Sequence, residues 1–156
     1  RALLLDRAQP LCRAGGGGPM TVAEMQRLVR EGVPLAGAWG VEVISFAAGE
    51  AVLRLPHHED LLRPGGTVSG PALMGLADVA MWVALLSLTG GRDESLTASL
   101  SITFLRPPAP RAVLAEARVI KKGRTLSYGE VTLRAEGEAA PCAHVTTSWA
   151  AVPQRG

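Results

Sequence analysis

A long stretch with a single charge constrains the fold of this chain more than any other feature. Between Pro64 and Gly91 the only charged residue is Asp78. A helix that is apolar nearly all round must be surrounded by other elements of the protein. The apolar part, Ala72–Leu88, is barely long enough to cross a bilayer, and an acid at its middle is costly in lipid. We therefore expect a buried core helix and no membrane span.

Local signals set the limits of this helix. Ser69 is a good N-cap residue, and Pro71 falls in the first turn, where a missing N–H does no harm. The pair Gly90-Gly91 ends the helix just after Leu88.

The residues before this helix predict one short helix and a hairpin. Thr21 and Glu24 form a capping-box pattern that starts an amphipathic helix ending near Gly32-Val33-Pro34. Two strands follow around a turn at residues 47–49, and residues 56–68 read as a loop; the strands are Val41–Phe46 and Glu50–Leu55.

The residues after the helix predict a sheet. Leu96–Leu105 alternates strictly between apolar and polar residues, which is typical of a half-buried strand. The apolar face would carry Leu96, Ala98, Leu100, Ile102 and Phe104. A hairpin with a basic turn and a last strand complete the set: Val113–Ile120, Leu126–Arg134 and Cys142–Val152. The order predicts an α+β fold, an antiparallel curved sheet wrapped around one long central helix.

Composition excludes several classes of protein. With 47% hydrophobic and 19% charged residues the chain can bury a core, and a net charge of +2 does not favour nucleic acid as a partner. Cys12 and Cys142 lie far apart and outside any metal motif, which favours a reducing cytoplasm. We expect residues 1–19 to form a flexible leader, with a natural start at Met20 and one domain over residues 20–156.

Asp78 is the strongest candidate for a functional residue. A carboxylate inside a buried helix is costly unless it is paired, protonated or functional. No basic residue lies one turn away, where the neighbours are Met74, Gly75, Met81 and Trp82. Residue type alone leaves two interpretations open: an acid that binds a neighbouring strand, or an acid that does chemistry.

Other polar segments are weaker candidates. The loop Arg63–Gly70 brings free N–H groups to the start of the helix, which suits a polarised carbonyl oxygen, although a plain loop has the same sequence character. The segment His57–Asp60 lacks metal-ligand spacing, and we expect no metal. His144 is expected to be structural. The basic turn Lys121–Arg124 is either a solvated tip or a phosphate contact.

Three motifs together resemble a known family. Gly66–Pro71 is followed by Leu76-Ala77-Asp78 and later by Ser101–Pro107, which ends in Phe-Leu-Arg-Pro. This pattern is similar to the PaaI-type hotdog-fold acyl-CoA thioesterases, within the 4-hydroxybenzoyl-CoA thioesterase-like superfamily. The order of elements agrees over residues 21–152.

The resemblance implies a homodimer or homotetramer with active sites at the dimer interface. It implies that Asp78 is the general base or the nucleophile, that the Gly70 N–H polarises the thioester carbonyl, and that the Thr97 hydroxyl helps to place water. It implies no metal and no cofactor, with CoA present only as part of an acyl-CoA substrate. The candidate substrate-binding residues are Ser69, Arg63, Gly66, Arg106, Lys121, Lys122 and Arg124.

The sequence also departs from the family pattern. Ser69 stands where the family usually has His, Pro71 where it has a second Gly, and Arg63 where it has an Asn-like residue. A non-hydrolytic acyl-binding or assembly module on the same fold is therefore the alternative to a thioesterase for a small or medium acyl group, aromatic groups included.

Overall fold

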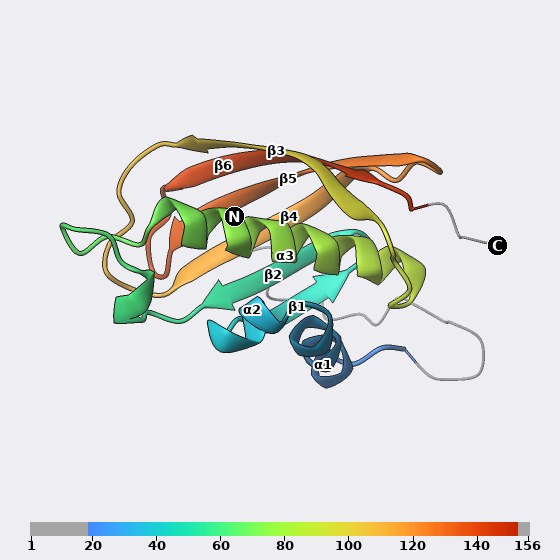
Figure 1. Cartoon of the computed structure of the whole chain (residues 1–156), viewed down its shortest axis with the longest axis horizontal. Helices are drawn as coiled ribbons and strands as arrows, with labels where there is room; N and C mark the ends of the chain where they lie inside the picture. The colour runs from blue at the N-terminus through green and yellow to red at the C-terminus, as the bar shows by residue number, and fades with distance from the viewer. Residues whose placement is uncertain (1–18, 153–156) are drawn as a thin grey trace.

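A six-stranded antiparallel sheet curves around one long helix in the computed structural model, which describes residues 19–152 (Figure 1). The strand order is β1-β2-β4-β5-β6-β3, so β1 and β3 are the two edges. The elements, in chain order, are α1 (Val22–Gly32), α2 (Pro34–Ala38), β1 (Glu42–Ala47), β2 (Glu50–Leu55), η1 (Glu59–Leu61), α3 (Gly70–Thr89), β3 (Leu96–Phe104), β4 (Val113–Lys121), β5 (Leu126–Ala135) and β6 (Ala143–Ala150). The predicted fold class is confirmed. The leader falls almost entirely outside the described residues.

The central helix α3 is the apolar stretch expected from the sequence. It is long and apolar enough to cross a membrane, yet 67% of its most apolar window is buried inside the protein. Gly90 ends it in the left-handed conformation, with φ 63°. A core helix is the interpretation that this packing supports.

One expectation for α3 is confirmed only in part. Ser69 occupies the N-cap position, but its side chain makes no capping hydrogen bond. A capping hydroxyl usually accepts from the second or third N–H of the helix, and the second residue here is Pro71, which has none. The backbone N–H of Ser69 donates instead to the Leu61 carbonyl at 2.8 Å.

The N-terminal elements cover α3 from the side away from β3 (Figure 1). The capping box of α1 is confirmed, since the Thr21 hydroxyl accepts from the Glu24 N–H and the Glu24 carboxylate accepts from the Thr21 N–H. The predicted hairpin is also confirmed as β1 and β2. The helices α2 and η1 were missed, because Pro34 begins a new helix rather than only ending α1.

The predicted alternation of β3 is wrong at its start. The pairing with β6 shifts register between Thr97 and Ser99, so Ala98 is the extra residue of a β-bulge. Thr97 pairs with the buried Trp149, and Leu100 and Ile102 pack on the core. The bulge therefore turns Thr97 to the helix side of the sheet.

With this bulge, β3 is much more exposed than the half-buried strand that the sequence predicted. Leu96, placed on the apolar face by the pattern, is 65% exposed. Only Leu100 and Ile102 of this strand are partly buried. Apolar side chains are therefore left open along this edge.

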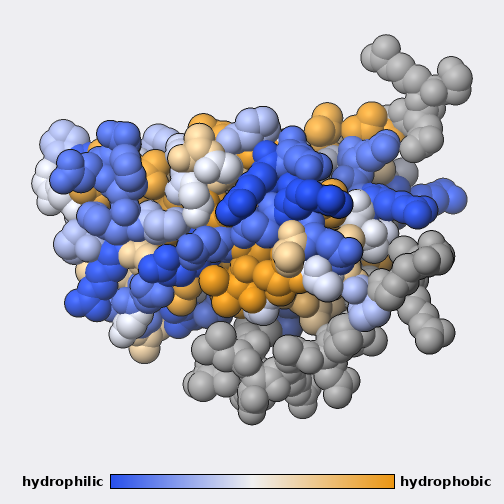
Figure 2. Space-filling view, turned by 90° about the horizontal axis from the view of Figure 1, so that it is seen from below, coloured by the Kyte–Doolittle hydropathy of each residue, from blue (hydrophilic) through white to orange (hydrophobic). Residues whose placement is uncertain are grey.

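The lower side of the molecule in Figure 1, away from β3, differs in the hydropathy of its surface. Seen from below, the surface is mainly hydrophilic, with a hydrophobic patch near its middle (Figure 2).

Candidate active site

All residues of α3 that keep some exposure lie on one side of the helix. On a wheel of 3.6 residues per turn they span an arc of about 140°, and Asp78 lies inside it. We call this side the open face; its residues are Gly70, Pro71, Met74, Gly75, Asp78, Trp82, Leu88 and Thr89. The open face lies between β3 on one side and α1 with α2 on the other (Figure 1).

Asp78 has one hydrogen-bond partner among the described residues. The Thr97 hydroxyl donates to Asp78 Oδ1 at 2.7 Å, and the bulge at Ala98 makes this contact possible. Burial raises the pKa of Asp78 and the bond from Thr97 lowers it, with burial dominating. Asp78 is the acid that the sequence singled out, and Thr97, which the family resemblance named, is its hydrogen-bond partner. A carboxylate with one bound oxygen, a raised pKa and an open side is suited to proton transfer or attack on a carbonyl.

Gly70 begins α3 with a free backbone donor. Within residues 19–152 its N–H makes no hydrogen bond. The ring of Phe104 lies against it, because a Cβ placed on Gly70 would be 3.2 Å from Phe104 Cζ. Asp78 follows Gly70 by eight positions, which is a rise of about 12 Å along the helix. One chain therefore does not bring these two predicted catalytic groups together.

Two indole rings border the open face on the side of α1 and α2. Trp39, directly after α2, lies where a side chain on Gly75 would be, with Cζ3 2.6 Å from the position of a Cβ. Trp82 reaches toward Gly32 in the same way, at 2.5 Å. Sequence reasoning missed both tryptophans, and the only hint was a glycine inside each helix.

A pocket of about 500 Å³ begins one helical turn from Asp78 toward the C-terminal end of α3, and Asp78 itself does not line it. Trp82, one turn after Asp78, and Ser95, two residues before Thr97, both line it. Its polar wall is a cluster that the sequence did not reveal. Asp93 accepts from the N–H and hydroxyl of Ser95 and from Lys122 Nζ at 3.1 Å. The ion pair and these hydrogen bonds hold the pKa of Asp93 below its usual value, although burial opposes them.

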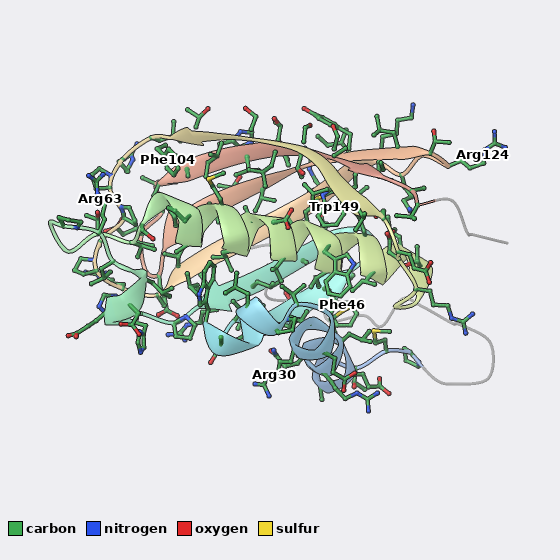
Figure 3. The ribbon with its side chains drawn as sticks, viewed as in Figure 1. Arg30, Phe46, Arg63, Phe104, Arg124 and Trp149 are labelled. Carbon is green, nitrogen blue, oxygen red and sulfur yellow. The ribbon has the colours of Figure 1, made fainter. Side chains whose placement is uncertain are left out.

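The predicted basic residues lie at opposite ends of the molecule. Arg63 and Phe104, with Arg106 two residues further on, lie at the N-terminal end of α3, whereas Arg124 lies at the other end (Figure 3). Of the basic turn only Lys122 lines the pocket; Lys121 and Arg124 are exposed at its tip. Gly66 has φ 77° and allows the tight turn before α3.

The other polar candidates are structural. The His58 ring accepts from the Asp60 N–H at 3.1 Å, so this segment folds on itself as η1. His144 Nε2 lies 3.2 Å from Glu130 Oε2, on β6 and β5. Among residues 19–152 no group of three or more His, Cys, Asp or Glu is placed to hold a metal ion.

A sheet curved around a central helix, with an acid on the helix's open face, defines the hotdog class of proteins. Residues 65–142 match the thioesterase superfamily domain, and this span holds Asp78, Gly70 and Thr97. The chain therefore belongs to the thioesterase superfamily, and the PaaI-type resemblance is confirmed.

Relatives from three organisms show the same likeness. A crystal structure of a protein from Silicibacter sp. TM1040, assigned as a thioesterase, is 35% identical, with a TM-score of 0.78 over 86% of this chain and 93% of that one. A mutant structure of the phenylacetic acid degradation protein PaaI from Thermus thermophilus is 27% identical, with a TM-score of 0.68 over 76% of this chain and 99% of that one. A protein of Saccharolobus solfataricus assigned as an esterase is 31% identical over 60% of this chain and 66% of its own length.

Proposed function

We propose that this protein hydrolyses the thioester of a small or medium acyl-CoA, giving the free acid and CoA. The observation that carries the proposal is Asp78, a half-buried acid with a raised pKa on the open face of α3, oriented by Thr97. As a general base, Asp78 takes a proton from water while the water oxygen adds to the carbonyl carbon; the C–S bond then breaks and the thiolate is protonated. As a nucleophile, its carboxylate adds to the carbonyl carbon and the C–S bond breaks, which gives a mixed anhydride and the CoA thiolate; water then hydrolyses the anhydride to the free acid, regenerates the Asp78 carboxylate and leaves a proton for the thiolate.

The site needs a second copy of the chain. Asp78 lies about 12 Å from the free N–H of Gly70 in its own helix, so the carbonyl-polarising donor must come from elsewhere. Two antiparallel copies of α3 related by a two-fold axis near Met74, halfway between them, would place each Asp78 beside the partner's Gly70. Met74 is 39% exposed, and apolar side chains of β3 are exposed beside it, as this packing requires.

The two directions away from Asp78 suit the two parts of the substrate. Toward the C-terminal end of α3 lies the pocket with Lys122, followed by the exposed Lys121 and Arg124. These cations suit the phosphates of CoA. Toward the N-terminal end lie Met74, Trp39 and Phe104, which suit an acyl group.

Free-thiol release from a panel of acyl-CoAs tests the proposal, with Asp78→Asn beside the wild type. We expect the substitution to lower kcat by about 10³-fold or more. The fold should survive, because an amide still accepts from Thr97 and removes a charge that burial disfavours. CoA binding without thiol release by the wild type would instead indicate the non-hydrolytic acyl-binding module.

The direction in which Asp78→Asn changes the melting temperature distinguishes a functional acid from a structural one. A raised pKa means that the acid's contribution to stability is present below its ordinary value and is lost as the pH rises through the raised one. The variant should therefore melt at the same or a higher temperature than the wild type at neutral pH. A much lower melting temperature with activity retained would make Asp78 structural.

A further inference from the structure

We propose that Trp39 sets the length of the acyl group, an inference that rests on the proposed function and adds the substrate class. The indole follows α2 directly and lies on α3 where Gly75 has no side chain, with Cζ3 and Cη2 2.6 and 2.9 Å from the position of a Cβ. Any larger residue at position 75 would displace it. The glycine and the indole thus form one packed unit.

This unit stands beside the reacting groups. Gly75 precedes Asp78 by three residues, so the two lie on neighbouring faces of α3, about 5 Å apart along the axis. Trp39 remains partly exposed although it packs against the core. Its ring therefore offers an apolar surface near the Asp78 carboxylate.

The surroundings of Trp39 fit an acyl chain and not a phosphate. Across the open face from it lie Met74, 39% exposed, and Phe104, 54% exposed. The polar wall with the Asp93–Lys122 ion pair lies on the other side of Asp78. An acyl chain that leaves Asp78 in the apolar direction runs toward the indole, which therefore limits the length of the chain that the wild type accepts.

The indole is held rigidly enough to discriminate between acyl chains of different length. The helix α2 begins with Pro34, which presets its backbone. The backbone N–H of Trp39 donates to the Leu35 carbonyl at 3.0 Å. The indole is held from one side by this turn and from the other by α3. A longer chain must displace it, and that cost appears as lower kcat/KM.

The test measures kcat/KM for butyryl-, hexanoyl-, octanoyl- and decanoyl-CoA in wild type, Trp39→Phe and Trp39→Ala. Each methylene that gains a buried site should raise kcat/KM about four-fold. We expect the ratio of decanoyl- to butyryl-CoA to rise by roughly 10-fold or more in Trp39→Ala, and by a smaller factor in Trp39→Phe, which keeps most of the packing. Leu35→Ala, on the exposed side of α2, should leave the ratio unchanged.

The outcomes separate this inference from the function on which it rests. If the Trp39 variants are folded and active with the wild-type ratio, while Asp78→Asn is inactive, Trp39 does not gauge length and the function stands. The inference is supported if the ratio changes in Trp39→Phe alone, even where Trp39→Ala fails to fold. Absence of Asp78-dependent hydrolysis of any acyl-CoA by the wild type would overturn both.

Discussion

The two edge strands of the sheet, β1 and β3, differ in how far the chain itself covers them. At β1 the Gln26 side chain donates to the Val41 carbonyl at 2.9 Å and accepts from the Val43 N–H at 2.7 Å, and a register shift at Ile44 interrupts the strand. At β3 the strand is exposed along most of its nine residues. An exposed edge is a template for pairing with another chain, and proteins usually blunt it. We therefore expect β3, and not β1, to be the edge that contacts a second copy of the chain.

The functional residues follow the same division. Thr97 lies on β3, and Asp78 and Met74 lie on the open face of α3 next to it. The β1 side carries packing contacts, such as the bond from the Gly49 N–H to the buried Ser87 hydroxyl at 2.9 Å. Under the proposed function, the open edge carries the catalytic residues, while the contacts of the closed edge stabilise the fold.

The largest effect should come from a charge on the open face. Met74→Lys would place two ammonium groups at the proposed two-fold axis, so we expect monomers and a loss of nearly all activity. Folding should persist, because Met74 is partly exposed in one chain. Light scattering and circular dichroism check these two results. Leu35→Lys is the matched control, at an apolar residue 55% exposed on α2. An active Met74→Lys monomer would contradict the expectation that the open face of α3 contacts a second copy.

A smaller effect is expected at Thr97. Thr97→Val keeps the shape and removes the hydroxyl that lowers the pKa of Asp78. The pKa should rise further, so the acid limb of the pH–rate profile should move to higher pH, with kcat lower by about 10-fold at neutral pH. Thr97→Ser should restore both. A profile that does not move in Thr97→Val would mean that this hydroxyl does not act on the catalytic acid.

The closed edge should respond in stability alone. Gln26→Ala removes two hydrogen bonds to the backbone of β1, at a cost of about 1–3 kcal/mol in the free energy of unfolding. Denaturant titration measures that loss, while the dimer and kcat per folded molecule should stay unchanged. A change in association state would show that the β1 edge also contacts a partner.

Much of the fold could be predicted because its signals are local. The capping box at Thr21, the uncharged helix and the glycines after it are each written within a few residues. The same holds for the β1–β2 and β4–β5 hairpins. The start of β3 could not be predicted, because the bulge at Ala98 exists only in the pairing with β6.

The site was predictable in part for the same reason. Asp78 stands out because it is the one charge in its stretch. Trp39 and the Asp93–Lys122 pair come from distant segments, and no local pattern marks them. The side-chain cap expected of Ser69 failed because Pro71 removed a donor, an effect that propensity alone does not include.

The central claim is that each active site combines Asp78 of one copy with Gly70 of another. Gly70→Pro removes the N–H at the first helical position, where proline is tolerated. Gly70→Ala is its control, because it adds a Cβ against Phe104 and keeps the donor. Asp78→Asn and Gly70→Pro should each be inactive alone.

The most direct measurement is thioester hydrolysis by a mixture of the two inactive variants, refolded together in equal amounts. Random pairing makes half of the dimers mixed, each with one intact site, so activity should return to about a quarter of the wild type. Mixing Asp78→Asn with itself gives the baseline. A mixture that stays at this baseline, although differently tagged copies of the two variants co-purify as mixed dimers, would contradict a site shared between two copies.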